Sequence, residues 1–138
     1  MTDENDKELS ERRAQIALIA DATSVWGVPG IEVEPEIVLV RWQIRRVLKS
    51  HYAFTQGDHF VGWNATHSEG RVSTTITQFD PTTGLGITQS GRAYQLRGPA
   101  GQDLDAAHVW RAWCPRAAID ETIDVTAEYV TLLARAKA

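Results

Sequence analysis

The chain has 138 residues, a formal net charge of −4, and 43% hydrophobic and 23% charged residues. This length suits one ordinary domain, and the composition excludes wholesale disorder. The acidic balance disfavours a dedicated nucleic-acid binder. We therefore expect residues 1–138 to form a single α+β domain.

Cysteine usage and the first residues indicate the cellular setting. Cys114 is the only cysteine, so no intrachain disulfide can form and a reducing cytoplasm fits best. The N-terminus is acidic and polar, unlike the basic and then apolar start of a signal peptide. The longest apolar stretch, around residues 37–40, is too short to span a bilayer. We expect a cytoplasmic protein without membrane contact.

The N-terminal part, residues 1–30, is predicted to be a helix followed by a linker. Over residues 4–23 helix formers dominate, and an apolar stripe recurs at helical spacing. The stripe comprises Leu9, Ile16 and Ala20, widened by Ala17 and Ile19. Residues 26–30 then break the helix, because they contain Gly27 and Pro29.

Residues 36–98 are predicted to form a five-stranded antiparallel meander, or a partly open small barrel. Apolar and polar residues alternate over 38–44, and β-branched residues favour a strand over 36–49, although 44–48 also fits a helical turn. Further strands are expected at residues 59–63, 72–78, 85–89 and 92–97.

Two turns set the register that we expect for the last three strands. Residues 80–83 form one loop, and Ser90-Gly91 suggests a tight two-residue hairpin. This register places Ile87 opposite Tyr94 and Ile76 opposite Ile87. One apolar face should then comprise Val72, Ile76, Leu85, Ile87, Tyr94 and Leu96.

Two helices are expected over residues 103–136, where they pack on the meander together with the N-terminal helix. Asp103 can cap a helix that ends near Cys114, because Pro115 cannot continue the hydrogen-bond ladder. Asp124 can cap a last helix over residues 125–136.

No catalytic, metal or nucleotide motif stands out. His59 and His67 lie in polar surroundings typical of exposed loop histidines, whereas His108 is expected to pack within its helix. Cys114 sits at a helix C-terminus, where the dipole raises the thiol pKa and disfavours a nucleophile. We therefore predict no cofactor, no metal and no enzymatic activity.

Basic and aromatic residues are the candidates for partner binding. Residues 41–49 hold four basic residues and no acid, which could contact an acidic partner or form a solvated face. The chain has five tryptophans; we expect most in the core, with Trp63 the best candidate for exposure. The candidate set comprises Arg41, Arg45, Arg46, Lys49, Trp63, Arg71 and Arg92.

A block of motifs resembles uncharacterised small accessory proteins of bacterial prophages and plasmids. It comprises Gly70-Arg71-Val72-Ser73, Phe79-Asp80-Pro81-Thr82-Thr83, Ser90–Gly98, the helix with Val109-Trp110, and Asp124-Val125-Thr126. The resemblance covers about half of the chain and implies a mobile-element protein. That class includes inhibitors of host defence such as anti-CRISPR proteins.

The leading hypothesis is a non-enzymatic protein-binding module, such as an inhibitor or regulator carried by a mobile element. Its alternatives are a small nucleic-acid-binding β domain that uses the basic strand, and an unrecognised enzyme or metal protein. The sequence leaves homodimer formation open.

Overall fold

A computed structural model describes residues 35–137 as an α+β structure. The helix expected over residues 4–23, and Trp26 after it, lie outside the described residues. The elements are β1 (Ile37–Ser50), η1 (Ala53–Thr55), β2 (Gly57–Asn64), β3 (Glu69–Asp80), β4 (Leu85–Thr88), β5 (Ala93–Leu96), α2 (Leu104–Arg116), β6 (Ile119–Asp124) and α3 (Thr126–Lys137).

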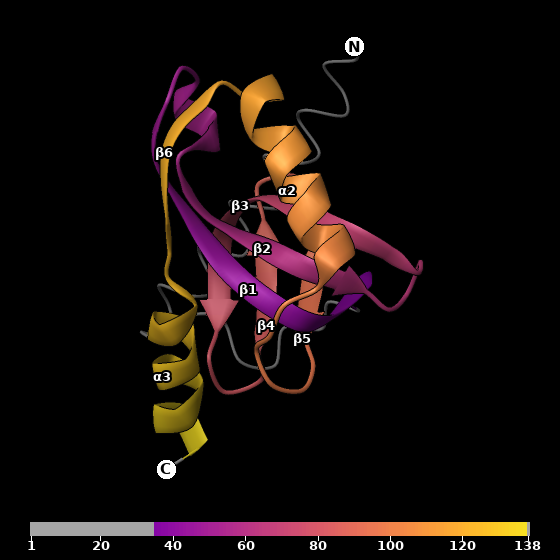
Figure 1. The fold of residues 1–138 in the computed structure, drawn as a ribbon. Coiled ribbons are helices and arrows are strands. Elements are labelled where there is room, and N and C mark those ends of the chain that lie inside the picture. The colour runs from indigo at the N-terminus through magenta and orange to yellow at the C-terminus, as the bar shows by residue number, and fades with distance from the viewer. Residues whose placement is uncertain (1–34, 138) are drawn as a thin grey trace.

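The sheet is mixed, with the strand order β2-β3-β4-β5-β1-β6 and a further pairing between β2 and β1 (Figure 1). The strands β1 to β5 thus form a ring, although not a regular barrel. The expected five-stranded antiparallel sheet is wrong in one pairing, because β5 runs parallel to the first residues of β1. The long β1 makes this closure feasible, since one part pairs with β5 and a later part with β6.

The sixth strand, β6, was not expected from the sequence. It joins the two helices and pairs antiparallel with the second half of β1, Arg46 lying opposite Ile123. Its sequence, Ile119–Asp124, carries three acidic residues and no long apolar run, so the usual strand signal is weak. Charged residues are common on such sheet-edge strands because they discourage pairing with other chains.

The predicted register of the β4–β5 hairpin is wrong by one residue. Ile87 lies opposite Ala93, and Gly86 lies opposite Tyr94. The loop has three residues instead of two: the N–H of Thr88 donates to the carbonyl of Arg92, and Gly91 takes a φ of +86°. A third loop residue in the left-handed region is a standard hairpin closure, and the slip reverses which side chains share a face.

The single apolar face predicted for the meander is therefore divided. Ile76 lies opposite Thr88 instead of Ile87, because the β3–β4 pairing closes at Asp80 and Leu85, one residue later on each strand than expected, and the bulge between Ile76 and Gln78 offsets only part of this shift. Tyr94 and Leu96 belong to the core cluster inside the ring, and Ile76 packs against that cluster. Leu85 and Ile87 belong to a separate small cluster, and Val72 packs under α2.

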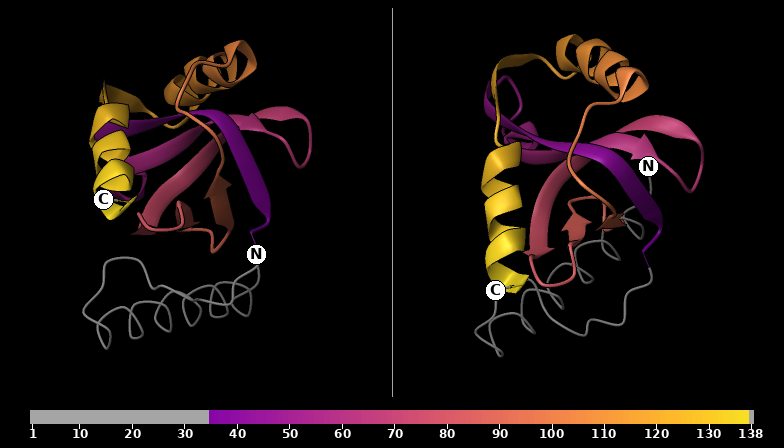
Figure 2. Two further views of the ribbon diagram at one scale, coloured as in Figure 1. Left: turned by 90° about the horizontal axis from the view of Figure 1, so that it is seen from below. Right: turned by 60° about the horizontal axis from the view of Figure 1, so that its bottom comes forward.

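The main core fills the ring. Its buried residues are Ile37, Leu39, Trp42, Ile44, Phe60, Phe79, Tyr94, Leu96, Val125 and Tyr129. Phe60 stacks on Tyr94 with ring centroids 5.1 Å apart, and Tyr129 of α3 meets Phe79 edge-on at 5.0 Å. Helix α3 thereby closes one side of the ring (Figure 2).

Helix α2 covers the outer face of β2 and β3 (Figures 1 and 2). Asp103 caps it as expected, its Oδ2 accepting the N–H of Ala106 at 3.0 Å. Ala106 and Trp110 are buried against Val47 and Val61. His108 points away and is exposed, so its expected packing is wrong.

The end of α2 also differs slightly from the expectation. Pro115 lies within the last turn, and the helix ends at Arg116. The N–H of Ala118 bonds to the carbonyl of Pro115 at 3.2 Å, and Ala118 has a φ of +53°. A left-handed residue just after the last turn therefore ends the helix, a common way for helices to stop.

His59 is buried, which contradicts its interpretation as an exposed loop residue. Its Nδ1 lies 2.8 Å from the carbonyl of Ser73, and its Nε2 lies 2.7 Å from the carbonyl of Thr55. A neutral imidazole donates to one acceptor and the doubly protonated ring donates to both. The ring thus connects β2 to β3 and η1. His51 and His67 are exposed, as is typical of loop histidines.

The close packing of Phe60 gives a first testable prediction. A Cβ added at Gly86 would overlap Phe60 Cζ, so Gly86→Ala should displace the ring from its stack on Tyr94. We expect a loss of about 1–3 kcal/mol in the free energy of unfolding, measured by urea denaturation.

Gly101→Ala is the matched control, because its Cβ would lie 3.6 Å from Arg41 Cα, an ordinary contact. It should change the unfolding free energy by less than about 0.5 kcal/mol. Equal stability of the two variants would contradict the tight interior packing.

Candidate partner-binding groove

A kink in β1 positions the candidate site. The register between β1 and β2 shifts between Val40 and Gln43, and Arg41 at this bulge has a φ of +46°. Such a conformation in a residue other than glycine costs about 1–3 kcal/mol and persists only where its surroundings enforce it. Gly62 of β2 permits the kink, because a Cβ there would lie 3.0 Å from Trp42 Cα. Bulges of this kind redirect side chains.

The kink directs Arg41 toward the start of α2. Its Nε and Nη2 donate to Oδ1 of Asp103 at 3.1 and 3.0 Å. The guanidinium carbon also lies 5.8 Å from the centre of the Trp63 ring, within cation–π range. Because Asp103 also caps α2, one carboxylate connects the helix start to the bulge.

A groove of about 200 Å³ lies between this part of β1 and α2. Gly70 of β3 allows the close approach of the helix, since a Cβ there would lie 2.5 Å from the backbone of Asp105. The lining residues are Arg41, Gln43 and Arg45 from β1, Val61 from β2, and Gln102, Asp103, Leu104, Ala106, Ala107 and Arg111 from α2 and the residues before it. We call this the arginine groove.

Two cations of the arginine groove lack a carboxylate partner among residues 35–137. Nε of Arg45 donates to Oε1 of Gln43 at 3.3 Å, a neutral acceptor. Arg111 is exposed, and none of the ion pairs in the described part of the chain includes it. Only Arg41 is paired, with Asp103. The groove therefore presents a net positive charge to an incoming group.

Apolar side chains flank the arginine groove. Leu104, the first residue of α2, is 84% exposed although it is large and hydrophobic. Trp63, the tryptophan expected to be exposed, is half-buried beneath Arg41. Trp42 and Trp110 are in the core, whereas Trp113 is half-buried like Trp63, so two of the four described tryptophans meet the expectation of a core position. Arginine and aromatic residues are enriched at protein interfaces.

Arg46, another of the proposed binding residues, is committed to an internal network. It donates to both oxygens of Asp58, at 2.7 and 3.2 Å, and to Glu128 of α3 at 3.3 Å. The hydroxyl of Tyr129 donates to the same Asp58 at 2.6 Å. The hydrogen bond with Asp58 raises the pKa of Arg46 further above its ordinary value. Its role in the structure is to hold α3 to the sheet.

The remaining proposed residues also lie away from the groove. Arg71 donates to the Tyr94 hydroxyl at 3.1 Å and to Glu69 at 3.3 Å. Burial lowers its pKa, but these two partners outweigh burial and raise it. Arg92 lies 3.8 Å from Glu36, and exposed Lys49 lies opposite Glu121 of β6. The structure thus brings together Arg41, Arg45 and Trp63 from the predicted set.

Arg111 is the groove residue that the sequence reasoning missed. Leu104, Ala107 and Arg111 follow one another at spacings of three and four, which places them on one helix face. That spacing could have been recognised from the sequence. The position of this helix face beside Arg45 could not, because it depends on how α2 crosses the sheet.

The arrangement offers little to a nucleophilic or metal-dependent reaction. Burial raises the pKa of the Cys114 thiol, and the charge of Arg45 only partly opposes this. Within residues 35–137 no three His, Cys, Asp or Glu side chains are placed to hold a metal ion. None of the helices in that range is long and apolar enough to cross a membrane.

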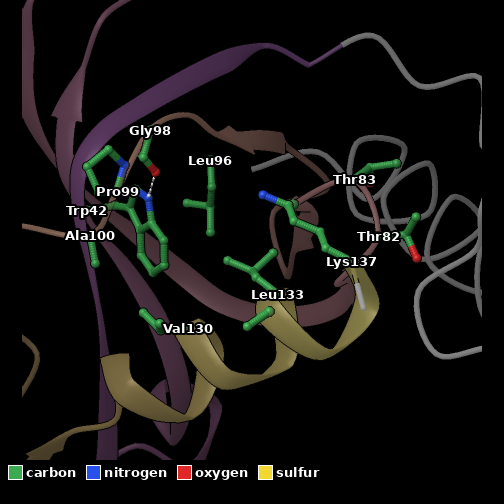
Figure 3. Close-up of a pocket in the computed structure, with 12 residues that line it drawn as sticks. Trp42, Thr82, Thr83, Leu96, Gly98, Pro99, Ala100, Val130, Leu133 and Lys137 are labelled. Carbon is green, nitrogen blue, oxygen red and sulfur yellow. Dashed lines mark hydrogen bonds between the residues drawn. The ribbon is translucent and has the colours of Figure 1, made fainter.

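A second, larger cavity of about 470 Å³ lies between α3 and the end of the ring (Figure 3). Trp42, Leu96, Val130 and Leu133 point into it, and Lys137 reaches its edge. The Trp42 Nε1 donates to the carbonyl of Gly98 at 3.0 Å, so its one polar group is satisfied. This apolar lining contains no acid–base pair.

Comparison with known proteins gives no relative: no family model, curated protein or solved structure matches the chain.

Asp103 joins the helix cap to the kink, which gives a second testable prediction. Asp103→Ala should lower the free energy of unfolding by about 1 kcal/mol through loss of the cap, and more once Arg41 loses its partner. The control is Asp105→Ala, an exposed acid in the same first turn. Chemical denaturation of both variants should rank Asp103→Ala well below the control. The reverse order would contradict the role assigned to Asp103.

The network at α3 gives a third testable prediction, on pH dependence. Burial, then the hydrogen bond and charge of Asp58, raise the pKa of Tyr129 above its ordinary value. The unfolded chain loses this proton near pH 10 while the folded chain keeps it, so stability should fall as the pH rises past about 10.

Tyr129→Phe should reduce this alkaline loss of stability. Part should persist, because burial raises the pKa of Tyr94 in the same direction. Tyr52→Phe, which removes an exposed phenol, is the control. Urea denaturation from about pH 9 to about pH 11 measures the slope. Identical slopes for wild type and Tyr129→Phe would contradict the assignment.

Proposed function

We propose that this chain is a non-enzymatic protein-binding module whose arginine groove takes an acidic segment of a partner protein. One observation carries the proposal: Arg45 and Arg111 line one groove without a carboxylate partner among the described residues. Elsewhere in that part of the chain, Arg46, Arg71 and Arg92 each have an acidic partner. Cations left unpaired beside an apolar edge suit recognition of carboxylates.

The surroundings of the groove support a protein partner. Leu104 offers an exposed apolar anchor, and the Arg41–Trp63 pair offers an aromatic edge. Arginine and tryptophan dominate the binding energy of many protein interfaces. The resemblance to prophage and plasmid accessory proteins supports the same direction. We therefore propose an inhibitor or regulator carried by a mobile element, in the manner of anti-CRISPR proteins.

A charge-reversal experiment tests the proposal and is the fourth testable prediction. Immobilised wild-type protein and an Arg45→Glu/Arg111→Glu variant are exposed to bacterial lysate, and the retained proteins are quantified by mass spectrometry. A true partner should be retained by wild type and lost from the variant. With the purified partner, Arg45→Ala should cost about 2 kcal/mol or more, over about tenfold in Kd.

The control is Lys49→Glu/Arg97→Glu, which makes the same charge change at exposed positions outside the groove. It should retain the partner as wild type does. If both variants lose the partner equally, the loss is explained by net charge alone, and specific binding in the arginine groove is contradicted. Retention of no protein above background would contradict a protein-binding function.

Nucleic acid is the alternative outcome of the same experiment. A nucleic-acid binder would give a mobility shift that weakens steeply as salt increases, because counterions are released on binding. The net charge of −4 disfavours this outcome. A salt-sensitive mobility shift that is lost in the Arg45→Glu/Arg111→Glu variant would show that the groove binds nucleic acid and would contradict a protein partner.

A further inference from the structure

The β4–β5 hairpin has an apolar patch on the face that points away from the ring. Gly86 and Tyr94 face the interior, so their neighbours Ile87 and Ala93 point outward. Ile87 is nevertheless only 2% exposed and Ala93 is fully buried. Their apolar neighbour among residues 35–137 is half-buried Leu85. We call Leu85, Ile87 and Ala93 the hairpin patch.

Neither described helix packs over the hairpin patch. Helix α2 lies on β2 and β3, and α3 contacts β1 at the side of the ring (Figure 2). The outer face of an antiparallel hairpin normally carries polar residues when it faces water. An isoleucine and an alanine there indicate that another apolar surface covers them.

The N-terminal segment enters the sheet directly beside this patch. The N–H of Glu36 donates to the carbonyl of Ala93 at 3.0 Å, and Ile37 lies opposite Tyr94. The 34 residues before Pro35 are outside the described part of the chain. A helix of 20 residues is about 30 Å long, whereas a strand of four residues spans about 13 Å. The segment is therefore long enough to cross the hairpin from its point of entry.

The sequence of that segment supplies a complementary surface. Residues 4–23 predict an amphipathic helix with an apolar stripe of Leu9, Ile16 and Ala20, widened by Ala17 and Ile19. We propose that this stripe packs on the hairpin patch, so that the N-terminal segment forms a third helical cover of the sheet. A tethered segment has a high effective concentration at an adjacent site, which favours it over a second copy of the chain.

Disulfide trapping in the full chain tests the contact. In a Cys114→Ser background, the pair Ile16→Cys/Leu85→Cys is oxidised at low protein concentration. The cross-linked product is then identified by mass spectrometry. We expect a monomeric disulfide that forms several-fold faster than in the control pair Gln15→Cys/Leu85→Cys, because Gln15 is not part of the stripe. Leu85 suits the test because it is only half-buried.

Three results would overturn the proposal. Equal rates for the two pairs would indicate random collision of the segment with the hairpin. Absence of a monomeric product would exclude proximity of Ile16 to the patch. Disulfide-linked dimers as the main product would assign the patch to a second copy of the chain.

A stability comparison keeps the test informative if the double-cysteine protein folds poorly. Ile16→Glu and Gln15→Glu introduce the same side chain at adjacent positions. Ile16→Glu should lower the melting temperature and speed thiol labelling of Leu85→Cys in the Cys114→Ser background, while Gln15→Glu changes neither. Unchanged labelling in Ile16→Glu would contradict the contact.

Discussion

One kinked strand organises the described part of the molecule. β1 pairs with three other strands, and it does so because its direction changes at Arg41. Before the kink it runs parallel to β5, and after the kink it pairs with β6. β2 follows it on both sides of the kink, where Gly62 leaves room for the bulge. The closure of the ring and the place of α2 both depend on this local geometry.

The arginines of the described residues form two groups. Those that serve the fold have internal acceptors, as Arg46 has in Asp58 and Arg71 has in Tyr94. The Arg46–Asp58 ion pair and the Arg71–Tyr94 hydrogen bond each hold one element against another. Removal of one partner of a buried ion pair is costly. The arginine groove differs because α2 contributes Arg111 to a surface that already holds Arg45. Its cations are thus available for an external group, which is why the groove carries our functional proposal.

Strand and helix positions could be predicted from the sequence, because alternation, capping and turn residues are local signals. Asp103 illustrates this, since its place before an apolar helical pattern marked it as a cap. The register of the β4–β5 hairpin could not be predicted from the sequence, because either a two-residue or a three-residue loop accommodates Gly91. The three-residue loop places Tyr94 opposite Gly86 on the interior face, where its ring stacks on Phe60, a contact between distant residues. β6 was missed because an acidic edge strand is stabilised by its pairing with β1.

The candidate site was predictable only in part, for the same reason. Arg41 and Arg45 stood out as a basic stretch, but so did Arg46, and neighbouring residues of a strand point to opposite faces. The bulge decides which arginines share a surface. Arg111 joins them from a helix that is distant in sequence. The tertiary structure therefore determines that Arg41, Arg45 and Arg111, among the basic residues of the chain, line one groove.

The most direct test observes the arginine side chains themselves. The Nε–H resonances of the arginines are recorded by NMR while a short glutamate-rich peptide is added to the full chain. The account predicts that the resonances of Arg41, Arg45 and Arg111 shift together and saturate, while those of Arg46 and Arg71 stay in place. Shifts at Arg46 and Arg71 without shifts at Arg45 and Arg111, or no shifts at all, would contradict it.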